Sequence, residues 1–172
     1  MLLAYKEGNY DVILQETRKF DSFEDWPWPL LYKQLYTLYK NDAVYVLTTR
    51  ITGSVWLQSL KNHCLNTDPD RPMRTLVYGY KYPHGYETEH LAFYENHNTN
   101  VRNFFRERDA PFVDLCWEKG DGWKELCAAL KMDVPHQPFP HVKPREFGVK
   151  PETRRQNEEN IAQQLRALGL TP

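Results

Sequence analysis

The chain has 172 residues, 41% of them hydrophobic, and its 22 basic and 23 acidic side chains leave a net charge of -1. This size predicts a single domain over residues 1–172 with one core, and the even charge gives no sign of a nucleic-acid partner. No apolar run approaches the ~18 residues that a membrane-spanning helix needs, and no secretory signal is found, so we expect no membrane partner and a cytoplasmic protein. Cys64, Cys116 and Cys127 have no CxxC spacing, which predicts buried thiols and no metal site.

The first part of the chain is predicted to be helical. Residues 2–18 have apolar positions at helical spacing with an interruption at Gly8, which predicts one helix or two short ones. Two prolines make residues 19–29 irregular, and Pro29 suits the first turn of a helix over residues 29–40. A strand over Ala43–Thr48 follows, and a short glycine-containing turn leads to a helix from about Ser54 to Leu65.

The second half continues the alternation of helices and strands. A tyrosine-rich loop over residues 76–87 precedes a long polar helix from about Glu87 to Arg108, and a second apolar strand covers Phe112–Trp117. The turn EKGDGW leads into a helix over residues 123–132. Residues 134–159 combine five prolines with many charges, which predicts an extended surface segment. In the carboxyl-terminal helical segment, residues 150–172, the helix begins at about Asn157 and ends at Gly169.

Continuous apolar strands separated by helices predict an α/β fold with a parallel sheet covered on both faces. Ligands of such folds bind at the carboxyl ends of the strands, where helix amino termini present free N–H groups to anions. Arg50 follows the first strand, and the EKGDG turn follows the second. Because a parallel sheet of two strands is too small to be stable alone, a larger sheet is expected.

Four stretches carry a resemblance to a known family: KFDSFEDWPWPLLYKQL, YVLTTRITGSVWLQSL, YPHGYETEHLAFYENHN, and DLCWEKGDGWKELCAAL followed by PFPHV. Together they resemble sulfotransferase-like proteins of the P-loop superfamily, in their bacterial and invertebrate branch, from Leu2 to about Val142. The resemblance implies a P-loop NTPase-like three-layer fold with a central parallel sheet. It also implies transfer of a sulfonate from 3′-phosphoadenosine 5′-phosphosulfate, the co-substrate, to a hydroxyl or amine.

By this resemblance Arg50 and Ser59 hold the 3′-phosphate of the donor, with Ser54 as a weaker candidate. A guanidinium suits that role because its planar fork matches phosphate oxygens and is always charged, while a hydroxyl adds a neutral donor. The alternatives are a surface salt bridge for Arg50 and an ordinary helix position for Ser59.

Family members begin with a strand and a KTGTT-like phosphate loop, and this sequence contains no such motif. We therefore expect an amino-terminally truncated fold and reduced transfer, because the donors that neutralise the leaving phosphate are lost. The alternative function is a non-catalytic remnant that acts as a binding or interaction module. An uncovered sheet edge would favour a homodimer.

A general base should take the proton of the acceptor, a small molecule that the sequence does not identify. The stretch FDSFEDWPW offers Asp21, Glu24 and Asp25 beside two tryptophans, whose cover could raise the pKa of a carboxylate. Asp21 or Asp25 is the predicted base. Alternatively, Asp25 begins the turn before Pro27, and both tryptophans belong to the core.

Several other residues are weaker candidates. His84 belongs to a loop that could form a lid over the acceptor, and His141 in PFPHV follows a family motif near the donor, although Lys143 replaces the asparagine usual there. His90 and His97 are two helical turns apart, too far for chelation, and are read as helix-face residues. Lys119 and Gly120 resemble a phosphate-binding turn, unless Asp121 caps the next helix.

Overall fold

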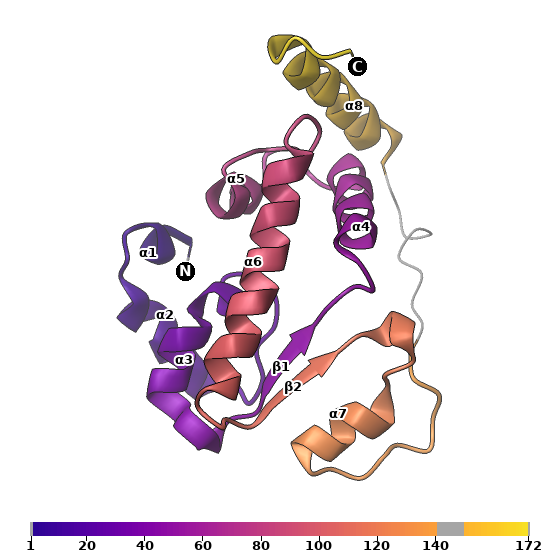
Figure 1. The fold of residues 1–172 in the computed structure, drawn as a ribbon. Coiled ribbons are helices and arrows are strands. Elements are labelled where there is room, and N and C mark those ends of the chain that lie inside the picture. Colours follow the sequence, from indigo (N-terminus) through magenta and orange to yellow (C-terminus); the bar gives the residue numbers. More distant parts are fainter. Residues whose placement is uncertain (1, 141–149, 172) are drawn as a thin grey trace.

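The computed structural model describes residues 2–140 and 150–171, and its ribbon is shown in Figure 1. The helices and strands follow one another as α1 (Leu2–Lys6), α2 (Tyr10–Glu16), α3 (Tyr32–Tyr39), β1 (Tyr45–Thr48), α4 (Gly53–Asn66), α5 (Pro72–Tyr78), α6 (Glu87–Arg106), β2 (Phe112–Leu115), α7 (Trp123–Leu130) and α8 (Pro151–Ala167). None of the helices in this described part is long and apolar enough to span a bilayer.

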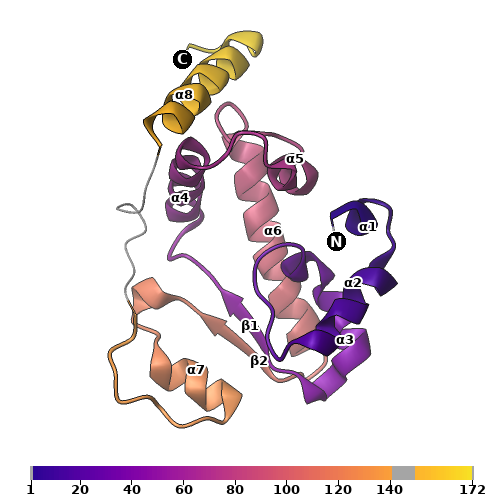
Figure 2. The same cartoon turned by 180° about the vertical axis from the view of Figure 1, so that it is seen from behind.

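The two predicted strands are confirmed, and they pair in parallel with Tyr45 opposite Phe112 and Thr48 opposite Leu115. In the described part of the chain, the sheet consists of β1 and β2 alone. The strands run between α6 on one side and α7 on the other (Figures 1 and 2). The α/β class is therefore confirmed in a mostly helical form.

The core beneath the sheet explains why α6 covers β1. Leu47 of β1 is buried with Val101 and Phe105 of α6, and Phe105 stacks on Tyr45 with 4.4 Å between ring centroids. Successive strand residues face opposite sides, so Val46 lies on the other face, where it is 41% exposed. The sheet is thus well covered on the α6 face, whereas β1 is partly open on the other.

The first helical stretch divides at Gly8, which has a φ of 71°, so the prediction of two short helices is confirmed. The sequence did not predict α5. Pro72 occupies its first turn and Gly79, with a φ of 82°, ends it. Because α5 continues to Tyr78, the predicted loop over residues 76–87 begins three residues too early. Pro72 suits the start of this helix, since a proline at the first helical position starts a helix rather than breaking one.

The same effect moves the start of α8. The helix begins at Pro151, six residues before the predicted Asn157, so the predicted extended segment was wrong over residues 151–156. The ion pair of Arg154 with Glu158, four residues apart, supports this first part of the helix. The remaining boundaries agree with the predictions within a few residues.

Helix α8 packs against α4 at the end of the molecule away from the strands (Figures 1 and 2). Ile161 of α8, Cys64 of α4 and Tyr82 form a buried cluster. Asn157 is completely buried, and its amide donates to the Leu65 and Thr67 carbonyls at the end of α4. These carbonyls lie where a helix leaves its acceptors without partners, so Asn157 completes the end of α4 from another helix.

The three cysteines are confirmed as buried free thiols.

Candidate functional site

The carboxyl ends of β1 and β2 bring Arg50 and the turn after β2 together. The Thr49 N–H continues the ladder by donating to the Leu115 carbonyl at 2.8 Å, which carries Arg50 to the sheet edge. The residues after β2 form a 3₁₀ turn, Trp117–Lys119. Because parallel strands end at the same edge, the two turns meet there. Arg50 and the turn after β2 therefore lie together at the edge where the sequence predicts an anion site.

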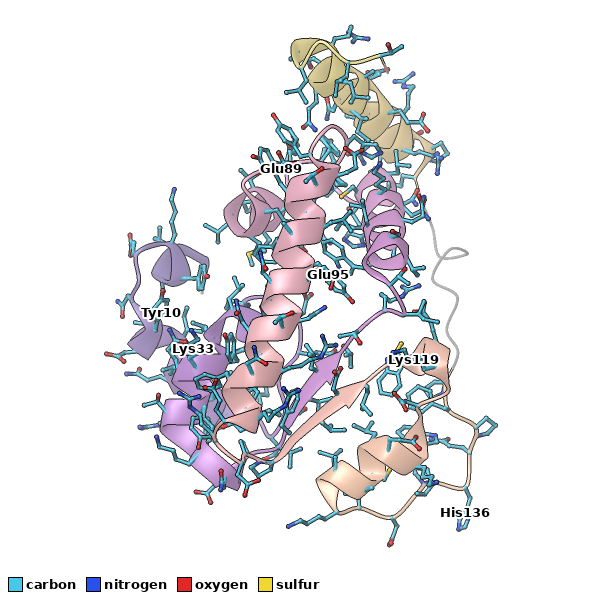
Figure 3. The ribbon with its side chains drawn as sticks, viewed as in Figure 1. Tyr10, Lys33, Glu89, Glu95, Lys119 and His136 are labelled. Atoms are coloured by element: carbon cyan, nitrogen blue, oxygen red, sulfur yellow. The ribbon has the colours of Figure 1, made fainter. Side chains whose placement is uncertain are left out.

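A small cavity of about 170 Å³ lies at this edge. Its lining comes from the β1–α4 loop, α6 and the turn after β2: Thr49, Arg50, Ile51, Thr52, Gly53, Tyr94, Glu95, Asn98, Arg102 and Lys119. Figure 3 labels Glu95 on α6 and Lys119 on the turn after β2. The cationic side chains of the cavity are Arg50, Arg102 and Lys119, of which Arg102 is paired with Asp114 of β2.

The Arg50 side chain contacts two residues. Its Nε donates to Oε1 of Glu118 at 2.7 Å, and its Nη2 lies 2.5 Å from the same oxygen. Its Nη1 donates to the Ser59 hydroxyl at 3.3 Å. The Arg50 side chain is 43% exposed. The contact with Glu118 is the surface salt bridge of the alternative interpretation. The contact with Ser59 joins the two residues that the resemblance places at the 3′-phosphate.

Glu118 also binds the backbone of the β1–α4 loop. Its second carboxylate oxygen accepts the Ile51 N–H at 2.7 Å. The hydrogen bond from Arg50, and next that from Ile51, lower the pKa of Glu118. Glu118 is thus ionised across the neutral range and bridges the two turns of the site. Sequence reasoning did not identify it, although it begins the EKGDG turn that was assigned to the ligand edge.

Helix α4 brings Ser59 to Arg50, and it does not bring Ser54. Ser54 is exposed in the first turn of α4, whose N-cap is Thr52, with a side chain that accepts the Val55 N–H at 3.2 Å. Ser59 lies farther along the helix and is half-buried. Gly53 lets α4 approach α6 closely, since a Cβ there would collide with the Glu95 carboxylate. The start of α4 therefore packs closely against α6.

Asp21 and Asp25 are both exposed, so the neighbouring tryptophans do not cover them. Asp25 has a φ of 62°, its carboxylate accepts the Trp26 N–H at 2.8 Å, and its carbonyl accepts the Trp28 N–H at 3.1 Å. This geometry is the turn of the alternative interpretation. No contact in the described part of the chain joins either aspartate to Arg50 or Ser59.

A row of aromatic rings nevertheless connects this turn to the strand edge. The Tyr94 hydroxyl accepts the Arg50 N–H at 2.9 Å, and the Tyr94 ring stacks on Trp56 with 4.4 Å between centroids. The centroid of the Tyr78 ring lies 6.1 Å from that of Trp56 and 6.0 Å from that of Trp26. Burial raises the pKa of Tyr78. The sequence showed many aromatic residues, but not that Tyr94 touches the backbone of Arg50.

The histidine-containing loop over residues 82–86 is attached to α8. Gln164 donates to the carbonyls of Tyr82 and His84 at 3.1 and 2.6 Å. His90 is buried on α6, where its Nδ1 lies 2.7 Å from the Tyr86 carbonyl, and burial lowers its pKa. His141 and Lys143 lie outside the described residues. Within residues 2–140 and 150–171, no group of histidine, cysteine and acidic side chains is arranged to hold a metal.

Asp121 does not cap α7. Its carboxylate accepts the Cys116 N–H at 2.7 Å, and Glu125 accepts the Gly122 N–H at the start of the helix. The capping alternative is therefore wrong for Asp121. Its carboxylate instead holds the turn against Cys116, the residue that follows β2. Lys119 remains at the cavity edge.

A second hollow, of about 500 Å³, lies between α3 and the last turns of α6, where Lys33 and Arg108 contribute to its lining. None of the predicted site residues lines it. Its size alone therefore does not make it the functional site, because the chemistry predicted from the sequence gathers at the strand ends.

Comparisons with known proteins identify a family and one relative. Residues 70–147 match the family described as a sulfotransferase domain. Ava biosynthesis cluster protein M of Aspergillus versicolor is 25% identical over 161 residues, which cover 80% of this chain and 58% of that protein. The chain thus spans less than two thirds of this relative's length. The sulfotransferase resemblance is confirmed by the family match, which includes Tyr94, Glu118 and Lys119 and begins after Arg50 and Ser59.

Proposed function

We propose, from the sulfotransferase domain match of residues 70–147, that the chain is part of a sulfotransferase that moves a sulfonate from 3′-phosphoadenosine 5′-phosphosulfate to a hydroxyl or amine. The observation that supports this most strongly is the approach of Arg50 Nη1 to the Ser59 hydroxyl, 3.3 Å apart at the carboxyl ends of two parallel strands. This edge is where nucleotides bind in open α/β sheets.

The residues at this edge fit a phosphate. The Arg50 guanidinium supplies a charged, planar donor set, and the Ser59 hydroxyl can donate to a second oxygen of the same group. Lys119, which lines the same cavity as Arg50, adds positive charge. When bound, the donor would supply the sulfonate, and the role of these three side chains would be to hold its 3′-phosphate in place.

Asp25 and Asp21 remain the proposed general bases. The aromatic row from Trp26 to Tyr94 supports Asp25, because it continues from the Asp25 turn to the backbone of Arg50. Flat aromatic walls also suit an acceptor that is itself planar. The resemblance also implies a larger central sheet of the P-loop type and a phosphate loop, and we include both in this proposal.

The direct test is calorimetric titration with adenosine 3′,5′-bisphosphate, the product form of the donor. Arg50→Ala should weaken binding by about 10- to 100-fold, because a hydrogen bond to a charged group contributes about 1.5–3 kcal/mol. Ser59→Ala should cost about tenfold, at the low end of the same range, because its hydroxyl carries no charge of its own. Arg106→Ala, at an exposed position in the last turn of α6, is the matched control and should bind like the wild type.

Each outcome separates the two candidate functions. Equal binding by the wild type and Arg50→Ala, or no binding to the wild type, would refute the 3′-phosphate site. Binding that needs Arg50, without transfer of labelled sulfonate to a panel of phenols and amines, would favour the non-catalytic binding module. Binding together with transfer would support the enzyme.

A further inference from the structure

Glu118 occupies the position that the proposed phosphate would take. One of its carboxylate oxygens accepts Arg50 Nε, and the other accepts the Ile51 N–H, both at 2.7 Å. A guanidinium edge and a backbone N–H directed at one anionic group are also the donors that a phosphate uses. The anion-binding groups of this edge are therefore engaged by an anion that the chain itself supplies.

Glu118 and a phosphate cannot share these donors. Arg50 Nε and the Ile51 N–H each carry a single hydrogen, so an incoming oxygen must replace the Glu118 carboxylate or leave both donors unused. The two negative charges would also repel each other at this distance. Only Nη1 of Arg50, which faces Ser59, is directed elsewhere.

The ion pair between Arg50 and Glu118 is exposed enough to be broken by a ligand. The Glu118 side chain is 30% exposed, and the 3₁₀ turn that carries it ends at Gly120, whose φ is 98°. A partly exposed ion pair is weak, so a ligand that carries more charge than a carboxylate and takes over the Arg50 and Ile51 donors can replace Glu118. A phosphate dianion meets that condition.

We propose that Glu118 is an intrinsic competitor for the phosphate site, closing the Arg50 fork in the free protein and admitting only a ligand whose phosphate displaces it. This inference rests on the proposed function, since it takes the nucleotide 3′-phosphate as the competing anion. Glu118 thereby determines affinity and favours dianionic phosphates over singly charged groups. It adds a role that is distinct from holding the nucleotide.

The test compares two alanine variants by calorimetry with adenosine 3′,5′-bisphosphate. Glu118→Ala removes the competitor and should tighten binding by about fivefold, the equivalent of about 1 kcal/mol. Glu95→Ala is the matched control, because it removes one carboxylate from the cavity that Arg50 lines and leaves the Arg50–Glu118 pair in place. Adenosine 5′-phosphate, which lacks the 3′-phosphate, should bind both variants like the wild type.

The results distinguish this inference from the proposed function. An equal gain in affinity in Glu118→Ala and Glu95→Ala would mean that Glu118 acts only through its negative charge near the site. This result would overturn the inference and leave nucleotide binding itself supported. An unchanged or weaker affinity in Glu118→Ala would overturn it too, and would make Glu118 a support for Arg50. If wild type, Glu118→Ala and Glu95→Ala all fail to bind the bisphosphate, the proposed function and the inference fail together.

Discussion

Replacing Asn157 should loosen α8 from α4 and lower the stability of the chain. The Asn157 side chain is fully buried, donates to the Leu65 and Thr67 carbonyls at 3.1 and 2.9 Å, and accepts the Tyr82 hydroxyl at 2.7 Å. Each of these bonds contributes about 1 kcal/mol, so Asn157→Ala should cost about 3 kcal/mol. For a chain of this size, the melting temperature should fall by about 6–12 °C.

The assay is thermal unfolding followed by circular dichroism. Gln156→Ala is the matched control, because Gln156 is exposed and its side chain bonds to Asn160 on its own helix, which predicts a change of a few tenths of a kcal/mol. Asn157→Asp separates hydrogen bonding from packing, since a carboxylate of the same shape offers no donor to the two carbonyls. A loss in Asn157→Ala no larger than that in Gln156→Ala would refute the reasoning, and a mild Asn157→Asp would assign the loss to the cavity.

Two further predictions concern stability. Gly85→Ala should destabilise the chain by about 1–3 kcal/mol in urea unfolding, because Gly85 has a φ of 81° and an added Cβ would lie 2.6 Å from Leu168 Cδ1. Gly79→Ala, with a φ of 82° and no atom within 4 Å of its Cβ, isolates the backbone strain, so an equal loss at both sites would contradict the clash. Burial lowers the folded-state pKa of His90 and His97 from the ordinary 6.5, so the unfolded chain binds protons first as the pH falls. Stability should therefore be fully present above pH 6.5 and decrease as the pH falls from there through the lowered pKa values; a urea midpoint that is constant or rises toward pH 5 would contradict this.

The strand ends could be predicted because the rule that places them is general. Short apolar runs at Ala43–Thr48 and Phe112–Trp117 mark buried strands, and parallel strands must end at one edge. The meeting of Arg50 with the turn at Glu118 followed from this rule without knowledge of the rest of the fold. The family motif then added Ser59, which no periodicity singles out.

The starts of α5 and α8, both at prolines, could not be predicted from the local sequence. Pro72 and Pro151 each stand in the first turn of a helix, where the missing N–H removes no hydrogen bond. No element is predicted from the sequence at Pro72, and an extended segment is predicted at Pro151. Each proline is visible in the sequence, but whether it starts a helix or interrupts one depends on whether the residues after it can pack against another element. For α8 that packing comes from α4, nearly 90 residues earlier in the chain.

The contacts that position Arg50 were beyond the reach of local reasoning because they join distant segments. Tyr94 binds the Arg50 N–H across 44 residues, and Glu118 binds the Ile51 N–H across 67. Neither residue belongs to a recognisable motif for that task. A side chain that completes a loop from another element leaves no pattern in the sequence on either side.

The same contacts decide how an Arg50 variant should be interpreted. The loop after β1 is held by backbone bonds, from the Arg50 N–H to Tyr94 and from the Ile51 N–H to Glu118. Arg50→Ala keeps both backbone donors and removes only an exposed side chain, whose described bonds go to Glu118 and Ser59. The loop should therefore keep its shape without the guanidinium. Loss of nucleotide binding in a variant that melts like the wild type would then measure the missing charge and its hydrogen bonds, not a collapse of the strand edge.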